Sequence, residues 1–182
     1  MSASGVTTAE PTAVQSPTVR ARHGSLWVVL AAAVVALLVV ARVFVAEPLR
    51  VQSSSMSPTL RAGDHVLVDK FLTSGRMPDR RDIVVLRSPV TGALLVKRVA
   101  AVAGDVVGLE AGVLVVNGHQ VRERYVDYRL MVGVYYGPVR VPAGDVFVLG
   151  DNRPDSVDSR TFGPVPVNRI TGRVLMRIWP PR

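Results

Sequence analysis

The chain has 182 residues, a formal net charge of +8 and 48% hydrophobic residues, which is enough for one globular domain with accessory segments. It has no cysteine, and this excludes a thiol nucleophile, a disulfide framework and a cysteine-ligated metal site. The three histidines are isolated and the arginines are dispersed, without a zinc-finger or RNA-binding signature. We therefore expect no metal, no cofactor and no nucleic-acid partner.

Residues 1–24 are rich in Ala, Ser, Thr and Pro and have no apolar periodicity, which predicts a disordered tail. The next segment is the one apolar run of membrane length, and it has no charge before Arg42. About 17–21 helical residues span a hydrocarbon core of ~30 Å, so we predict a single transmembrane helix over residues 25–46. A cleaved secretory signal with Arg20 and Arg22 as its basic region is the alternative. The long preceding tail and the length of the run favour a retained anchor.

Charge gives little information on the orientation of this helix. Arg20 and Arg22 precede it, whereas Arg42 and Arg50 follow it, so the positive-inside rule barely discriminates. The tail is short and the rest of the chain lies on the C-terminal side. The expected arrangement places residues 1–24 in the cytoplasm and residues 47–182 outside it.

Short apolar or β-branched runs, bounded by Gly, Pro, Asp or Ser, follow the anchor. They cover residues 65–69, 82–86, 93–96, 113–116, 119–121, 146–149 and 173–179. Asn117-Gly118 separates two of these runs and predicts a hairpin with a type I′ turn. No amphipathic helix of ordinary length is expected after residue 50, so residues 47–182 are predicted to form a mainly β domain.

A serine cluster, Ser53-Ser54-Ser55-Met56-Ser57-Pro58-Thr59-Leu60, follows the anchor. On its own, such a cluster is typical of a solvated turn. A serine hydroxyl becomes an effective nucleophile only when a base lies within hydrogen-bond reach. His65 is a candidate base, but it opens a β run, and we interpret it as structural.

Lys97, one of two lysines in the chain, is the other candidate base. Strand alternation sends Lys97 and Arg98 to opposite faces, so one of them can be buried. Lysine is the better residue to bury, because burial lowers its pKa whereas arginine keeps its proton. Lys70 has Asp69 beside it, which stabilises the lysine's charge and makes it a worse base. Spacing alone favours an ordinary strand with two solvated cations.

A dense polar run, Gly150-Asp151-Asn152-Arg153-Pro154-Asp155-Ser156-Val157-Asp158-Ser159-Arg160, directly follows an apolar strand. A solvated loop with surface ion pairs is the ordinary interpretation. Because a packed strand fixes its start, a functional role is also possible, since loops held on a rigid scaffold often carry function.

These motifs resemble, in the same order, the sequence boxes of the bacterial type I signal peptidases. The serine cluster resembles their nucleophile box, S-x-S-M-x-P-T-L, and residues 63–71 are similar to their second box. Lys97-Arg98-Val99 begins their base-carrying box, and residues 150–160 match G-D-N-R-x-x-S-x-D-S-R at every specified position. One departure follows the base, where Ala101 and Ala103 replace residues that are usually the glycine and the proline of G…P-G-D in the family.

The resemblance implies a signal-peptidase-like, β-barrel-type catalytic domain behind a membrane anchor. It implies a serine endopeptidase at the plasma membrane that removes N-terminal signal peptides from secreted precursors. Those precursors, membrane lipid and the translocation machinery are the implied partners. From Ala46 to Ser55 the chain reaches at most ~32 Å, so the nucleophile is expected close to the membrane surface.

The resemblance also assigns the site residues. It makes Ser55 the nucleophile and Lys97 the general base. The backbone N–H of Ser55 and the hydroxyl of Ser53 would form the oxyanion hole. The base-orienting and supporting residues would be Ser156, Asp158 and Arg160.

Two other classes of protein fit parts of the sequence. A self-cleaving repressor has a similar Ser/Lys arrangement, but it carries a DNA-binding module where this chain has the apolar run. A membrane-tethered, non-catalytic β domain would not need Ser55 or Lys97. The four tyrosines are expected in the core rather than in a substrate groove; they are Tyr125, Tyr128, Tyr135 and Tyr136.

Overall fold

The computed structural model describes residues 27–37, 46–70, 77–131 and 133–180, in two compact units, Met1–Val40 and Ala41–Arg182. In the first unit, residues 27–37 are helical. Among the described residues, no helix reaches the length and apolarity that a membrane span requires. The predicted tail and most of the predicted span lie outside the described residues, so the transmembrane helix stays a prediction.

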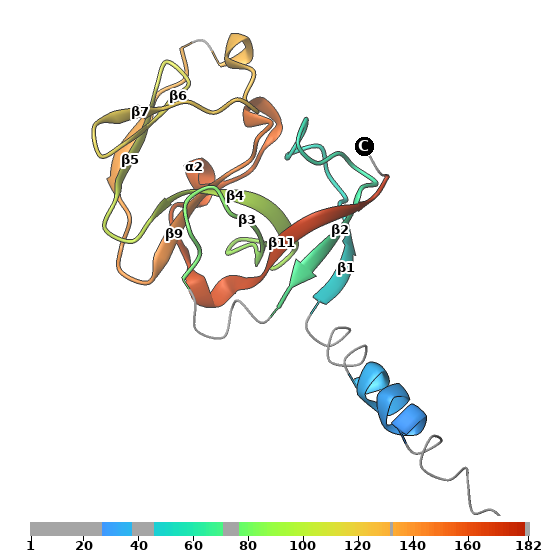
Figure 1. Cartoon of the computed structure of the whole chain (residues 1–182). Helices are drawn as coiled ribbons and strands as arrows, with labels where there is room; N and C mark the ends of the chain where they lie inside the picture. Colours follow the sequence, from blue (N-terminus) through green and yellow to red (C-terminus); the bar gives the residue numbers. More distant parts are fainter. Residues whose placement is uncertain (1–26, 38–45, 71–76, 132, 181–182) are drawn as a thin grey trace, which may run out of the picture. The chain divides into compact units, whose positions relative to one another are not determined.

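The second unit is mainly β, as predicted, and Figure 1 shows its strands. Its helical elements in the described residues are three or four residues long. The strands are β1 Ala46–Arg50, β2 His65–Asp69, β3 Ile83–Arg87, β4 Leu94–Val102, β5 Val106–Glu110, β6 Val113–Val116, β7 His119–Val121, β8 Tyr136–Arg140, β9 Asp145–Leu149, β10 Val165–Pro166 and β11 Ile170–Trp179. The short helices are η2 Tyr128–Leu130, η3 Arg153–Asp155, α2 Ser159–Phe162 and η4 Val167–Arg169.

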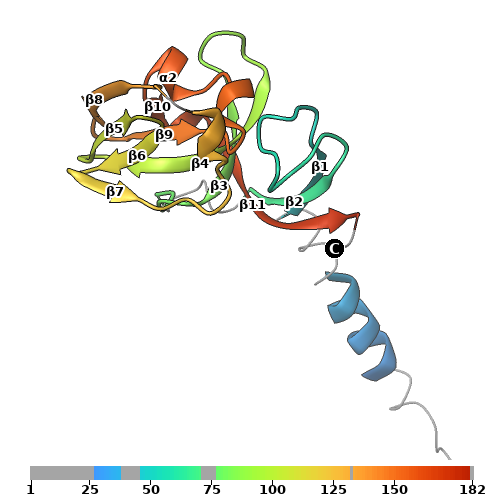
Figure 2. The same ribbon diagram turned by 90° about the horizontal axis from the view of Figure 1, so that it is seen from above.

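Two antiparallel sheets make up this unit. A seven-stranded sheet has the order β1-β2-β11-β3-β4-β9-β10, and a four-stranded sheet has the order β7-β6-β5-β8. Figures 1 and 2 show the smaller sheet beside the β4 and β9 end of the larger one. The chain passes between the sheets at the turn after β4, where Gly104 has a φ of 88° that glycine adopts without strain.

Local sequence explains most of the strands. The burial of β2 alternates residue by residue, as expected for a strand with one face in the core. Asn117 and Gly118 both have positive φ values, 53° and 78°, so the predicted type I′ hairpin between β6 and β7 is confirmed. The sequence analysis missed β1, β5, β8 and β10.

Two of the missed strands contain glycine, a residue that in a sequence usually indicates a turn. A Cβ added to Gly108 of β5 would lie 2.9 Å from the Tyr136 carbonyl oxygen. The glycine therefore permits the close approach of β8 rather than ending β5.

Three clusters of buried apolar residues hold the second unit together. One includes Phe147 and Leu149 of β9 with Val107 and Leu114 of the smaller sheet, so it joins the two sheets. The second lies among β3, β4, β9 and β11. The third packs Met56 and Leu60, which belong to the serine cluster, against the larger sheet. Met56 and Leu60 are 1% and 4% exposed, so burial fixes the position of the segment that carries Ser55.

We predict that Phe147→Ala lowers the free energy of unfolding by about 3–5 kcal/mol, because it leaves a cavity at the junction of the two sheets. Urea titration monitored by fluorescence measures this loss. Val90→Ala, at a side chain 71% exposed, is the control and should change the value by less than about 0.5 kcal/mol. A small loss for Phe147→Ala would show that the cluster does not stabilise the junction.

Candidate active site

Ser55 lies in a tight turn that the surrounding backbone fixes. The Val51 N–H donates to the Asp64 carbonyl at 2.8 Å, and the Ser57 N–H donates to the Ser54 carbonyl at 2.9 Å. With Met56 packed in the core, the Ser55 side chain faces inward and is 6% exposed. A residue in a serine-rich turn is thus buried, although serine-rich turns are usually solvated.

Lys97 of β4 meets Ser55. Its Nζ donates to the Ser55 Oγ at 2.6 Å, and Lys97 is 2% exposed. Among the described residues, Ser55 is the one side chain that accepts a hydrogen bond from this nitrogen. Burial lowers the pKa of Lys97, and Arg160 lowers it further, while the charges of Asp158 and Asp151 oppose the shift. The pair therefore has the geometry and the direction of pKa shift that a serine–lysine dyad needs.

Ser53 adds a second hydroxyl beside the nucleophile. The Oγ atoms of Ser53 and Ser55 are 3.1 Å apart. In the described part of the chain, the Ser55 backbone N–H has no acceptor. Both donors predicted for the oxyanion hole thus lie at the turn, with the Ser53 hydroxyl in contact with the Ser55 Oγ.

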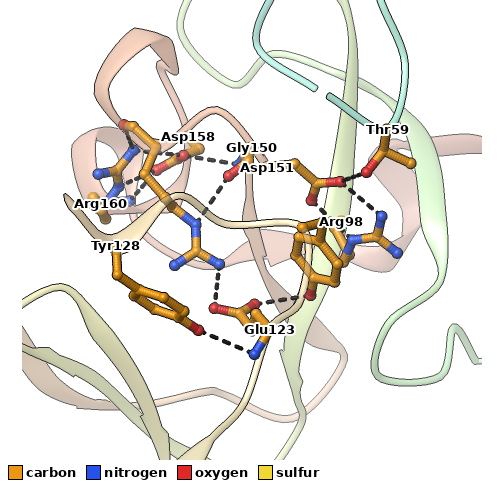
Figure 3. Close-up of polar contacts among 10 residues, drawn as sticks. Thr59, Arg98, Glu123, Tyr128, Gly150, Asp151, Asp158 and Arg160 are labelled. Atoms are coloured by element: carbon orange, nitrogen blue, oxygen red, sulfur yellow. Dashed lines mark hydrogen bonds and ion pairs between the residues drawn. The ribbon is translucent and has the colours of Figure 1, made fainter. Parts of the chain in front are cut away.

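Asp158 and Arg160 form a two-pronged ion pair, shown in Figure 3. The Arg160 Nε and Nη2 donate to the two carboxylate oxygens at 2.8 and 2.9 Å. Asp158 is fully buried and also accepts from the Gly150 N–H at 3.0 Å. Arg160 donates to the Arg153 carbonyl at 2.6 Å, so the pair closes both ends of the polar loop.

Ser156 packs against Gly150 rather than bonding to Lys97. Its Oγ is buried without a hydrogen-bond partner in the described residues. A Cβ added to Gly150 would lie 2.2 Å from this Oγ and 2.6 Å from the Ser55 carbonyl oxygen. The absence of a side chain at Gly150 is therefore what lets the polar loop lie against the nucleophile turn.

Asp151 connects the neighbours of the two reacting residues, a link that the sequence analysis missed. Its carboxylate accepts from the Nε and Nη2 of Arg98, at 2.8 and 2.7 Å, and from the Thr59 hydroxyl at 2.5 Å. Arg98 directly follows Lys97, and Thr59 is four residues beyond Ser55. The Asn152 N–H also donates to the Ser55 carbonyl at 3.0 Å. Each of these residues belongs to a quoted motif, but the motifs do not reveal the pairing.

A buried ion pair connects the polar loop to the segment after β7. Arg153 and Glu123, 2% and 3% exposed, approach to 2.5 Å. The Tyr125 hydroxyl donates to Glu123 at 2.9 Å, and the Arg98 guanidinium lies 4.1 Å from the centre of the Tyr125 ring. Burial and the Glu123 charge raise the pKa of Tyr125. No motif contains Glu123 or Tyr125; Tyr125 was expected only among the core tyrosines, and Glu123 was not singled out.

The remaining sequence candidates lie in ordinary structural positions. His65 begins β2, paired with Arg50 and Trp179. Tyr136 packs against Phe147, with ring centres 5.5 Å apart, whereas Tyr135 is 71% exposed. The expectation of core tyrosines therefore holds for Tyr136 and fails for Tyr135. Within the described residues, no three His, Asp or Glu side chains converge as a metal site would require.

The two departures from the family motif lie beyond the base. Ala101 is fully buried in the cluster that joins the two sheets, and Ala103 precedes Gly104 in the turn after β4. The Asp105 N–H donates to the Val102 carbonyl at 3.0 Å across this turn. The turn is therefore formed with alanine at both positions, and Lys97 still reaches Ser55.

A groove lies against the larger sheet near the open edge of β4. Strand β9 pairs with β4 from Arg98 onward, so in the described strands residues 94–97 have a partner only on the β3 side. A cavity of about 290 Å³ begins at Leu94 and extends over the β3 side of the sheet. Its wall combines three apolar residues with four polar or charged ones, which are Leu49, Val68, Val85, Glu47, Lys70, Arg87 and Thr171. The open strand edge itself suits an extended peptide.

Comparisons with known proteins agree on one family. The model of the family described as "Signal peptidase, peptidase S26" matches residues 25–179. Signal peptidase I of Leptolyngbya laminosa is 36% identical in an alignment 151 residues long. The alignment covers 76% of this chain and 71% of that protein. The probable thylakoidal processing peptidase 2 of Arabidopsis thaliana is 39% identical. That alignment covers 75% of this chain and 39% of the Arabidopsis protein.

A solved structure gives a further comparison. The signal peptidase I of Enterococcus faecalis V583 has 33% sequence identity and a TM-score of 0.49, covering 56% of this chain and 98% of that one. The family match and the identities of the relatives favour an enzyme over a non-catalytic binding domain. The chain belongs to the signal peptidase family S26, whose members named signal peptidase I are serine endopeptidases.

Proposed function

We propose that this protein is a membrane-anchored serine endopeptidase that removes N-terminal signal peptides from secreted precursors, with Ser55 as nucleophile and Lys97 as general base. The observation that carries the proposal is the 2.6 Å contact between the Lys97 Nζ and the Ser55 Oγ. Both residues are buried, and burial favours the neutral amine that a base requires.

The proposed reaction begins when the neutral Lys97 amine takes the Ser55 hydroxyl proton as the Oγ attacks the scissile carbonyl carbon. The resulting oxyanion accepts hydrogen bonds from the Ser55 N–H and the Ser53 hydroxyl. The Lys97 ammonium then protonates the departing amine of the mature protein, leaving the signal peptide esterified to Ser55. Water, deprotonated by Lys97, hydrolyses this ester and restores both residues.

The supporting residues hold the polar loop and the nucleophile turn in place. The Asp158–Arg160 pair fixes the loop, and the side chain of Ser156 lies where that loop meets the nucleophile turn. We propose that Ser156 orients the Lys97 amine during the reaction. Asp151 limits the separation of Ser55 and Lys97 by joining Thr59 to Arg98.

The precursor would bind as an added strand along the open edge of β4. Residues before the cut would extend from Lys97 toward Leu94, where the cavity over the β3 side begins. Main-chain hydrogen bonds would supply affinity and shallow pockets would select small side chains near the cut. The segment further upstream is the apolar part of a signal peptide, and Leu94, Leu49 and Val68 of the cavity offer it apolar contact.

The proposed setting is the plasma membrane, with the tail in the cytoplasm and the catalytic unit outside. Ser55 is the ninth residue after Ala46, so the end of the predicted anchor and the nucleophile are close along the chain. Membrane lipid and the secretory translocation machinery are the proposed partners besides the precursor. This arrangement presents the cleavage site of a membrane-held signal peptide at the level of the dyad.

We predict that Ser55→Ala and Lys97→Ala each abolish cleavage of a purified secretory precursor by the full-length protein in detergent. Lys97→Arg should be equally inactive, because arginine stays protonated. Gel analysis with N-terminal sequencing of the product measures the cut, and circular dichroism checks the fold of each variant. Full activity in a lysine variant would exclude the proposed base.

We predict that Ser53→Ala lowers kcat about 10²–10³-fold, as expected for loss of one oxyanion donor. The matched control is Ser54→Ala, one residue along, whose hydroxyl bonds to Asp155 instead. Steady-state kinetics on one precursor peptide separates kcat from KM. Equal effects of the two substitutions would argue that Ser53 does not bind the oxyanion.

We predict that kcat/KM rises with pH, because only the neutral Lys97 amine accepts the proton. Burial lowers the pKa of Lys97 from its ordinary value of 10.5, so the midpoint of this rise should lie below pH 10.5. The pH profile of kcat/KM measures it. A midpoint at or above pH 10.5 would contradict the role of burial.

Folding stability provides an independent check on the same pKa. Between the lowered pKa and 10.5 the unfolded state binds more protons, so the free energy of unfolding should fall as the pH falls through this window. Lys97→Met should lack this contribution.

A further inference from the structure

A second pocket opens on the other side of the nucleophile turn. It has a volume of about 290 Å³, and its wall includes Ser57, Pro58, Tyr125, Asp127, Asn152 and Pro154. Three separate segments thus converge on it: the serine cluster, the segment after β7 and the polar loop. The proposed function leaves this pocket without a role.

The pocket lies where a bound peptide would continue past the dyad. The open edge of β4 ends at Arg98, where the pairing with β9 begins at Leu149. A chain that follows this edge beyond Lys97 therefore meets the polar loop that comes directly after β9. Asn152 of that loop donates its N–H to the Ser55 carbonyl at 3.0 Å, so the pocket wall contacts the nucleophile turn itself.

Residues that follow the cut would enter this pocket. The cavity at Leu94 lies at the opposite end of the open edge, on the side proposed for the signal peptide. One residue of extended chain covers about 3.3–3.6 Å. Ser57 in the wall of the pocket is two residues beyond Ser55. The first three residues of the mature protein can therefore reach the pocket.

The floor of the pocket is held in place by buried charges. Asp151 and Arg153 both line it, and each is 2% exposed and paired, with Arg98 and Glu123 respectively. Arg98 also lies over the Tyr125 ring. Figure 3 shows Asp151 bonded to Arg98 and to Thr59, with Glu123 nearby in the same close-up. The buried charges are already compensated, and Asp127 is the charged side chain of the lining that solvent reaches, with 44% of it exposed.

Asp127 places a carboxylate on the rim of the pocket, where both of its oxygens are paired with the Arg129 guanidinium. Its side chain is 44% exposed, and it accepts hydrogen bonds from the backbone and guanidinium of Arg129. Those hydrogen bonds hold the pKa of Asp127 below its ordinary value. The Arg129 side chain is 89% exposed, and such surface pairs are weak, so another cation can share or replace it.

The walls and the rim together fit one kind of side chain. Pro58, Pro154 and the Tyr125 ring offer apolar contact for a hydrocarbon stem, while Asp127 offers an anion for a charged end. Lysine and arginine combine a long apolar stem with a cationic end. We propose that this pocket binds a lysine or arginine side chain among the first three residues after the cut, an inference that rests on the proposed function.

The test uses the full-length protein in detergent and peptides that carry one cleavage site. Lysine, methionine or glutamate is placed at the first, second or third position after the cut. At one of these positions the lysine peptide should have a kcat/KM about two- to fivefold above the methionine peptide, the range expected for an exposed ion pair. The glutamate peptide should fall below methionine, and salt should weaken both differences.

Asp127→Asn is the decisive variant, because asparagine can still cap η2 as Asp127 does. It should bring the lysine-to-methionine ratio close to one. Glu110→Gln removes an equal charge from an exposed position on β5 and should leave every ratio unchanged. Equal cleavage of lysine and glutamate peptides by the wild type, or a lysine preference that survives in Asp127→Asn, would overturn the subsite and leave the peptidase standing. Failure of the wild type to cut any peptide would overturn the proposed function itself.

Discussion

The structure depends on keeping an amine out of water within hydrogen-bond distance of a hydroxyl. Lys97 is almost completely buried, and desolvation is the main influence on its pKa. A buried lysine is costly while it is charged, because the protein interior solvates an ammonium poorly. The carboxylates around it would restore that charge if they were unpaired. In this fold the two nearest, Asp158 and Asp151, each bind an arginine, which reduces their pull on the Lys97 proton.

The same arginine pairs hold the site together. The polar loop, the nucleophile turn and β4 come from distant parts of the chain, and none of them alone fixes the separation of Ser55 and Lys97. Asp151 joins the turn to β4, and Arg153 joins the loop to the segment after β7. That segment begins after Val121 of β7, which packs against the apolar cluster around Phe147. Contacts to both sheets thus surround the Ser55–Lys97 pair.

The sequence was sufficient to predict the mainly β character and the Asn117-Gly118 hairpin, and to identify the motifs that carry the candidate dyad. These features depend on short-range patterns, such as alternation along a strand and the positive φ of a turn. The pairings of Glu123 with Arg153 and of Asp151 with Thr59 depend on contacts between residues far apart in the chain, and no local pattern encodes them. Strands β5 and β8 were missed because Gly108 and Pro138 resemble turn residues until the neighbouring strand is seen. A motif also does not determine every contact of its residues. Ser156 has a clear motif position, but its predicted contact with Lys97 is not formed in the described structure.

Lysine and arginine have different positions around the candidate site, and this affects how the site responds to pH. Of 22 basic side chains apart from histidine, two are lysines, and every cation that braces the polar loop in the described contacts is an arginine. Arginine keeps its proton at pH values that discharge lysine. An alkaline medium therefore deprotonates lysine without breaking the arginine ion pairs that hold the polar loop. The Lys97 amine and the ion pairs around it respond to different ranges of pH, so a rise in pH leaves the packing of the candidate site in place.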